Sequence, residues 1–287
     1  MFFHYKGLQF EAKPERPDPV LAKHLQELLG GAFGEMTVAM QYMFQGWNCR
    51  VPGKYKDLIL DTGTEELAHV EMIATMIARL LEGAPEAAYV EAAKDPMTAA
   101  IIAGTNPQHK IVQGLGPSLT DSAGEAWHGK YIVASGNLMA DFMANAAAEA
   151  QGRIQAARVY NMTDDPGVRE MLSFNLARDR MHQNQWLAAI EELRADGLED
   201  LPTPSHFPSS DEHMDAGYTL YNFSEGEDSA QGRWASGPTP DGKGEFRYEP
   251  APQPAAPEPV LPPTPPTYYG TPSTGAGVVQ KVKDVLS

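Results

Sequence analysis

Two helix-length segments of the chain each carry an acidic residue three positions before a histidine, at the centre of a stripe that is otherwise apolar. The pairs are Glu66 with His69 and Asp179 with His182. Residues three apart lie on the same face of a helix, so both members of each pair face the core. Buried carboxylates are costly unless they are protonated, paired or bound to a cation. A chain with this pattern therefore has to bring these polar groups together in its core.

A second pair of helix-length segments supplies one more inward carboxylate each. Glu35 lies 34 residues before His69, and Glu149 lies 33 residues before His182, so the two halves of the chain repeat one arrangement. A single acid-x-x-His pair is a weak signal, but four segments in register are typical of four-helix bundles that hold two metal ions. Carboxylates combined with one imidazole per metal suit manganese, iron or zinc. The pattern therefore predicts a dimetal site.

Proline and glycine mark where the helices begin and end. The expected helices cover residues 19–47, 55–81, 136–161 and 166–195. Asp18 before Pro19 provides a side chain that can cap the first helix and a proline at its first position. Residues 84–135 form a long connection between the second and third helices. We therefore expect an all-α, ferritin-like four-helix bundle with a long crossover.

The end of the chain has a different composition. Ten of the 24 prolines lie between Pro250 and Pro272, a density that excludes a helix or a central strand. Such a segment is extended, polyproline-like or disordered. We expect residues 1–197 to form the bundle and residues 198–287 to form an extended, Pro-rich C-terminal segment.

The charge balance excludes several classes of partner. Acidic residues outnumber basic ones by 38 to 22, which argues against binding to nucleic acids or anionic membranes because both need clustered Lys and Arg. No apolar run approaches the roughly 18 residues that a membrane-spanning helix needs. The N-terminus lacks the apolar region of a secretory signal. Cys49 is the single cysteine, which excludes an intrachain disulfide and predicts a reducing, cytoplasmic location.

Asp179 differs from the ideal bundle, which has Glu at this position. Its side chain is one methylene shorter than that of Glu, so we expect it to act beside the metals and not on them. It would serve there as a proton acceptor or as a group that orients His182.

At these positions the sequence resembles the manganese catalases, a family of non-haem catalases. The similarity covers about residues 1–230, and its most specific segments are LGGAFGEMT at 29–37, DTGTEELAHVE at 61–71, VYNMTDDP at 159–166 and YNFS at 221–224. The resemblance implies an enzyme that converts hydrogen peroxide to water and oxygen. Its two manganese ions would cycle between the II/II and III/III states.

The resemblance also implies roles for individual residues. The family holds two manganese ions per subunit with three Glu and two His, which match Glu35, Glu66, His69, Glu149 and His182, and one Glu is expected to bridge the ions. Tyr42 matches a tyrosine that hydrogen-bonds a ligand carboxylate. Some members have Glu in place of Asp179, and some have an Arg guarding the metals where this chain has Ala148.

Certain members of the family bind calcium between subunits. The corresponding residues here are Asp57, Asp61, Asn222, Ser224 and Gly226. Asp57 and Asp61 lie four apart on a helix face turned away from Glu66, which suits a separate oxygen-ligand site but is equally typical of a solvated acidic face. Members are typically homohexamers whose C-terminal segments wrap neighbouring subunits, so we expect the tail of this chain to take part in assembly.

Two other functions are consistent with the same ligand pattern. A di-iron peroxidase, oxidase or iron store uses the same kinds of ligand, and the sequence does not distinguish manganese from iron. The usual di-iron pattern has four ligating carboxylates, so the shorter Asp179 favours manganese. A ferritin-like structural protein, such as a coat component, would keep the motif without turnover.

Overall fold

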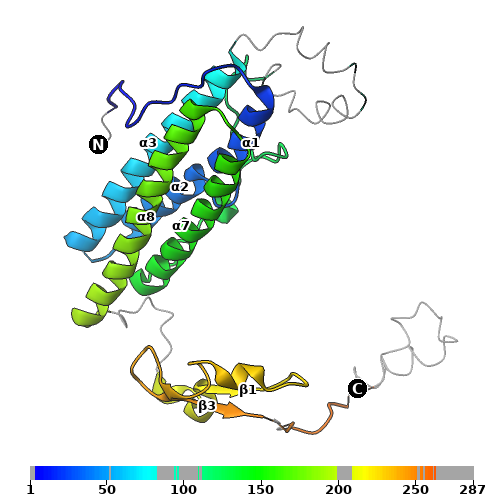
Figure 1. The fold of residues 1–287 in the computed structure, drawn as a ribbon. Coiled ribbons are helices and arrows are strands. Elements are labelled where there is room, and N and C mark those ends of the chain that lie inside the picture. Colours follow the sequence, from blue (N-terminus) through cyan, green and yellow to red (C-terminus); the bar gives the residue numbers. More distant parts are fainter. Residues whose placement is uncertain are drawn as a thin grey trace, which may run out of the picture. The chain divides into compact units, whose positions relative to one another are not determined.

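The computed structural model describes residues 4–51, 53–82, 94, 96, 109, 112–198, 209–250, 253–254, 256–260 and 262. The chain divides into two units, Met1–His206 and Phe207–Ser287. The first part of the predicted crossover and most of the Pro-rich segment lie outside the described residues. Within the first unit, long helices lie side by side as a bundle (Figure 1). The expected ferritin-like fold class is therefore confirmed.

The helices of the bundle begin and end close to the predicted positions. They are α1 (Pro19–Gly30), α2 (Glu35–Asn48), α3 (Lys54–Leu81), α7 (Leu138–Asn161) and α8 (Pro166–Ala195). The predicted caps are present, because the Asp18 carboxylate accepts from the backbone N–H groups of Val20 and Leu21, and that of Asp165 accepts from Val168 N–H. Helix α2 packs mainly against α3, and α7 packs mainly against α8. These are the two helix pairs that the half-chain repeat predicted.

One prediction was wrong: residues 19–47 do not form a single helix. The chain leaves the helix at Gly31, whose ψ is 170°, and re-enters it after Gly34, whose ψ is 169°. The hydroxyl of Thr37 donates to the carbonyl of Gly31 at 3.0 Å and closes the break. A Cβ at Gly34 would lie 2.8 Å from the carbonyl oxygen of Leu28, so the close approach there requires glycine. As a result, Glu35 is the first residue of α2.

The interior of the bundle consists of two apolar clusters with a polar layer between them. On α3 the polar layer falls between Ile59 of one cluster and Met72 of the other. On α8 it falls between Leu172 and Trp186. One cluster draws on α1, α3, α7 and α8, with Leu25, Leu28, Ile73, Met76 and Met171 among its members. The other includes Tyr42, Tyr55, Phe142, Ile190 and Leu193. The inward carboxylates and histidines are thus enclosed by apolar side chains at both ends.

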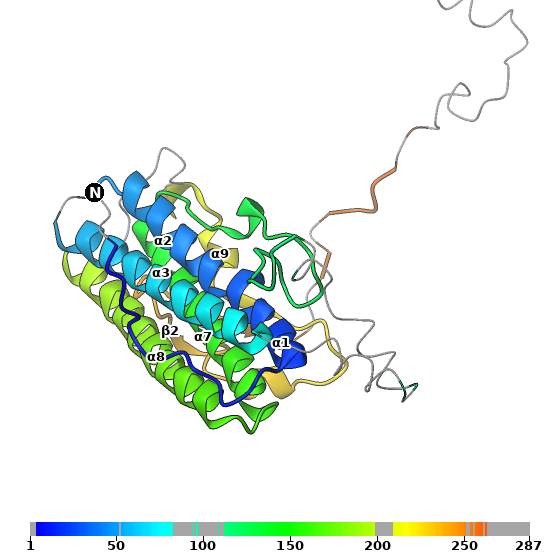
Figure 2. The same ribbon diagram turned by 90° about the horizontal axis from the view of Figure 1, so that it is seen from above.

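The N-terminal segment runs along the outside of α3 and α8 (Figure 2, dark blue). His4 contacts Glu71 on α3 at 3.0 Å, and the side-chain amide of Gln9 donates to Glu65 on the same helix at 2.7 Å. Phe10 stacks on Phe174 of α8, with ring centroids 4.6 Å apart. This segment therefore bridges two helices of the bundle.

The described part of the crossover is hydrogen-bonded to side-chain amides of α1 and α2. Gln26 donates to the carbonyls of Ser118 and Thr120 at 2.7 and 2.8 Å. Val133 N–H donates to Gln41 at 2.9 Å, and the Gln45 amide donates to Val133 O at 2.8 Å. These bonds satisfy buried polar groups on both partners.

The second unit contains strands that the sequence did not predict. Strands β1 (Thr219–Tyr221), β2 (Gly237–Pro238) and β3 (Glu245–Glu249) form a sheet in the order β1-β3-β2. Strand β3 is parallel to β1 and antiparallel to β2. The unit also contains the short helix α9 (Met214–Gly217). Among the helices in the described ranges, none has the length and apolar character needed to cross a membrane.

Candidate metal centre

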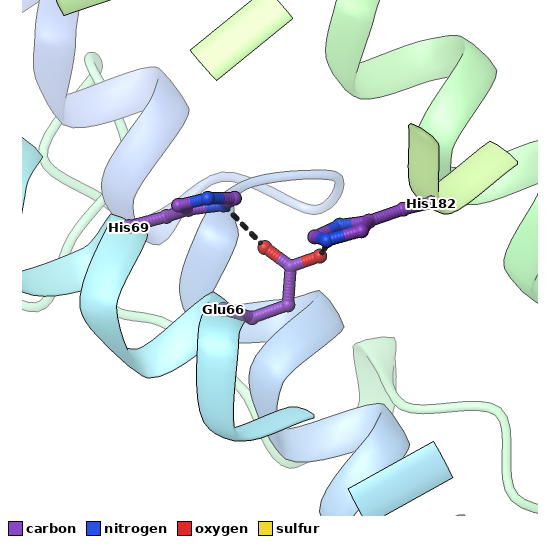
Figure 3. Close-up of side chains that lie close together, drawn as sticks. All are labelled: Glu66, His69 and His182. Carbon is purple, nitrogen blue, oxygen red and sulfur yellow. Dashed lines mark hydrogen bonds and ion pairs between the residues drawn. The ribbon is translucent and has the colours of Figure 1, made fainter. Parts of the chain in front are cut away.

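The carboxylate of Glu66 lies between two imidazole rings at the centre of the polar layer (Figure 3). Its Oε2 is 2.7 Å from Nδ1 of His69, and its Oε1 is 2.6 Å from Nδ1 of His182. The two rings are nearly parallel, with centroids 5.5 Å apart. Because Glu66 and His69 lie three apart on α3 and His182 faces them from α8, the helix pairing brings the three groups together. None of them is more than 1% exposed.

Glu35 and Asp179 lie beside His69. Glu35 Oε2 is 3.6 Å from Nδ1 of His69, and donor atoms of Glu35, His69 and Asp179 all lie within 4.8 Å of one another. The amide nitrogen of Asn175 donates to Glu35 at 2.7 Å and to Asp179 at 3.0 Å. This amide connects the two carboxylates.

Glu149 lies on the other side, beside His182. Its Oε1 is 3.8 Å from Nδ1 of His182 and accepts a hydrogen bond from the Tyr42 hydroxyl at 2.5 Å. The ring of Tyr42 packs against Trp186, with centroids 5.0 Å apart. The structure therefore brings together all five predicted metal ligands, together with Asp179 and Tyr42.

Several carboxyl groups in the cluster resist ionisation. Burial and the charge of Glu66 raise the pKa of Glu35 above its usual value, and the same two causes raise the pKa of Glu149. Burial and the charge of Glu35 raise the pKa of Asp179. Carboxyl groups that are crowded in this way become ionised when cations bind among them.

The pKa of Glu66 is shifted in the opposite direction, because two histidines flank its carboxylate. Burial alone would raise its pKa, but His69 and His182 hold it well below the usual range. Burial alone would lower the pKa of His182, but Glu65 and Glu66 raise it to about 10. Among the protein groups alone, Glu66 is therefore the ionised centre of the cluster.

The donor atoms fit metal ions better than they fit one another. Glu66 Oε1 and His182 Nδ1 are close, yet neither has a partner with hydrogen-bond geometry among the described residues. Buried polar atoms without a hydrogen-bond partner are rare in folded proteins. Carboxylate oxygens and imidazole nitrogens are ligands of divalent first-row metals. The chemistry of this donor set thus fits divalent first-row metal ions.

Glu65 and Asn175 contact the cluster but were not predicted to have a role. Glu65 accepts from Nε2 of His182 at 3.1 Å and forms a two-point ion pair with Arg178. Its position four residues before His69 was a usable signal, because residues four apart share a helix face. Asn175 lies on the inward stripe of α8, but an amide there is equally typical of ordinary core hydrogen bonding.

The candidate calcium residues belong to both units of the chain. Asp57 and Asp61 are exposed on α3. In the second unit, the Asn222 side chain accepts from Ser224 N–H at 3.0 Å and donates to the carbonyl of Gly226 at 3.2 Å. These three residues form one turn.

Comparison with known proteins gives a consistent result. Residues 1–284 match the family described as manganese containing catalase. A manganese catalase of Bacillus subtilis is 56% identical over 271 residues, which cover 94% of this chain and 98% of the relative. That of Lactiplantibacillus plantarum is 47% identical over 229 residues, covering 80% and 85%. The crystal structure of KatB, a manganese catalase from Anabaena PCC7120, superposes with a TM-score of 0.68 at 28% identity, covering 88% of this chain and 100% of KatB.

Proposed function

The chain belongs to the manganese-containing catalase family, and we propose that it disproportionates hydrogen peroxide to water and oxygen at the buried cluster around Glu66. The position of the Glu66 carboxylate carries this proposal. Its two oxygens face Nδ1 of His69 and Nδ1 of His182, at 2.7 and 2.6 Å. A carboxylate placed in this way can bridge two metal ions that each take one imidazole.

Five side chains would hold two manganese ions in each chain. Glu35 and His69 would serve one ion, Glu149 and His182 the other, and Glu66 both. When bound, the manganese pair supplies two-electron redox chemistry, cycling between the II/II and III/III states. The three carboxylates offset much of the cationic charge, and the two apolar clusters restrict water around the site.

The other polar residues of the cluster handle protons and orient the ligands. Disproportionation requires a base that accepts protons from peroxide and returns them when water forms. Asp179 suits this role because it is buried beside Glu35, and Asn175 holds its Oδ1 at 3.0 Å. Tyr42 fixes Glu149 through its hydroxyl. Ala148, which precedes Glu149, is buried in the apolar cluster that contains Tyr42 and Trp186.

Metal analysis combined with an oxygen-release assay tests this proposal. We expect the purified protein to contain two manganese ions per chain and to release oxygen from hydrogen peroxide. Bound iron without oxygen release would contradict the proposal and favour a di-iron peroxidase or oxidase. A protein with neither bound metal nor turnover would favour a structural role.

We also propose that the chain acts in the cytoplasm as a homohexamer, with calcium bound between subunits. The single cysteine supports the location. Phe223 and Trp234 of the second unit are 87% and 57% exposed in the isolated chain, which supports a role for this unit in subunit contacts. Exposed oxygen groups of Asp57 and Asp61 could provide one part of a calcium site, and the turn at 222–226 another.

Light scattering tests the assembly. We expect the full chain to have the mass of six subunits and a chain ending after Ala235 to assemble into fewer subunits, because this deletion removes β2 and β3 and leaves β1 without its partner strand. A calcium chelator, or replacing Asp57 and Asp61 together with Asn, should also lower the mass. A truncated chain that still assembles into six subunits would contradict the role of the tail. An assembly that keeps six subunits without calcium would contradict the calcium site.

A further inference from the structure

Glu65 lies on the opposite side of the two imidazoles from Glu66. Its Oε2 is 3.1 Å from Nε2 of His182, and its Oε1 is 3.7 Å from Nε2 of His69. Glu66 contacts Nδ1 of the same two rings. Each histidine is therefore placed between two carboxylates, one at each ring nitrogen.

Three contacts from two other parts of the chain hold the Glu65 carboxylate in place. Arg178 on α8 donates from Nε to Oε1 at 2.6 Å and from a terminal nitrogen to Oε2 at 3.0 Å. Gln9 of the N-terminal segment donates to Oε1 at 2.7 Å. A planar guanidinium that binds both oxygens fixes the orientation of a carboxylate better than a single bond does. Glu65 is consequently held with one oxygen directed to each imidazole.

We propose that Glu65 is a positioning residue for the manganese site, which accepts the Nε2–H of both histidines and so leaves Nδ1 of each free to bind metal. This inference rests on the proposed function. A neutral imidazole has one N–H, and an acceptor at Nε2 places the proton there. Histidines that bind metals characteristically donate their other ring N–H to a carboxylate, a carbonyl or water.

His69 supports this role for Glu65. Its Nε2 is buried and has no hydrogen-bond partner among the described residues, and it faces Glu65 Oε1 across 3.7 Å. A small rotation of the ring toward Glu65 would form this bond while Nδ1 stays directed to the metal side. The same carboxylate would then fix both imidazoles, one from α3 and one from α8.

Manganese release distinguishes this positioning role from a general effect on the fold. The variants are Glu65→Gln, which keeps the size but replaces one acceptor oxygen with a donor, and Glu71→Gln as the matched control. Glu71 lies on the same helix and also contacts the N-terminal segment, through His4, but it does not contact either metal-site histidine in any described hydrogen bond or ion pair. Manganese per chain and its rate of release into excess EDTA are measured, with circular dichroism as a check of the fold.

We expect Glu65→Gln to release manganese faster than the wild type by about 10-fold or more, the range typical of lost partners of metal-binding histidines. Glu71→Gln should stay within about twofold of the wild type, as expected for an exposed pair. If Glu65→Gln loses helix content, manganese release is measured on Arg178→Leu instead. This variant removes the ion pair of Glu65, and the fold should tolerate it because the Arg178 side chain is 34% exposed. Faster release from that variant supports the proposal, and an unchanged rate overturns it.

Different results would contradict the proposed function and the positioning role of Glu65. A wild-type protein that binds no manganese contradicts the proposed function and this inference with it. A wild-type protein that holds manganese and releases oxygen, together with a folded Glu65→Gln variant that releases manganese at the wild-type rate, contradicts the positioning role alone.

Discussion

Replacing Glu66 with alanine is expected to remove both the bound manganese and the release of oxygen from peroxide. The two oxygens of Glu66 contact Nδ1 of His69 and Nδ1 of His182, so this carboxylate connects the two imidazoles on the metal side. Its loss would separate the two halves of the site. We expect oxygen release to fall by more than about 100-fold, because losses of up to that size already follow when only an outer partner of a metal ligand is removed.

The variant also needs a test of its fold, because Glu66 is buried against two imidazoles. Removing one partner of a buried ion pair typically costs about 3–5 kcal/mol. Glu66→Gln, which keeps the side-chain volume, therefore accompanies Glu66→Ala, and Glu71→Ala serves as the control on the same helix. Manganese is measured by elemental analysis and oxygen with an electrode. Oxygen release that persists in folded Glu66→Ala and His69→Ala proteins would contradict the site assignment.

Replacing Trp186 with alanine is expected to produce the largest loss of stability among single changes in the apolar clusters. Trp186 is fully buried and packs on Tyr42 and Phe142, with ring centroids 5.0 and 5.3 Å away. Large-to-small changes of an aromatic residue in a core cost about 3–5 kcal/mol in the free energy of unfolding. The cavity would also lie next to Tyr42, so we expect a loss of activity beyond the loss of stability.

Leu187→Ala is the matched control, because the neighbouring side chain is 48% exposed on the same helix. Its free energy of unfolding should change by no more than about 0.5 kcal/mol. Both variants are unfolded in urea at the same protein and manganese concentrations, since bound metal and assembly stabilise the folded state. Equal unfolding midpoints for the two variants would show that Trp186 does not hold this end of the bundle together.

The sequence predicted the parts of the fold that depend on helical periodicity. The inward positions of Glu66 and His69 follow from their spacing, and the 33- to 34-residue repeat indicated which helices pair. The break between α1 and α2 was missed because the apolar stripe continues through it, and because glycine is tolerated inside helices. The break is seen in the extended backbone of Gly31 and Gly34 and in the close approach at Gly34.

The role of Glu65 and the strands of the second unit were also not predicted from the sequence, each for a physical reason. The role of Glu65 depends on Arg178, 113 residues away on α8, and on Gln9 from the N-terminal segment, so it follows from the packing of three elements and not from spacing along one. Strands β1 and β2 are three and two residues long, too short to show an alternating pattern. Their pairing with β3 becomes visible only in three dimensions.

The glycine break has a consequence for how this bundle can be redesigned. Apolar residues of α1 pack in one cluster and those of α2 in the other, so the break divides the first half of the bundle into two blocks that can be altered separately. Repacking α1 to change thermal tolerance should leave Glu35 at its place in the first turn of α2. A continuous helix would transmit the same change along its axis to the metal ligand. The first half of the chain is therefore modular at this point, with the α1 side of the bundle available for engineering while α2 keeps Glu35 in the metal layer.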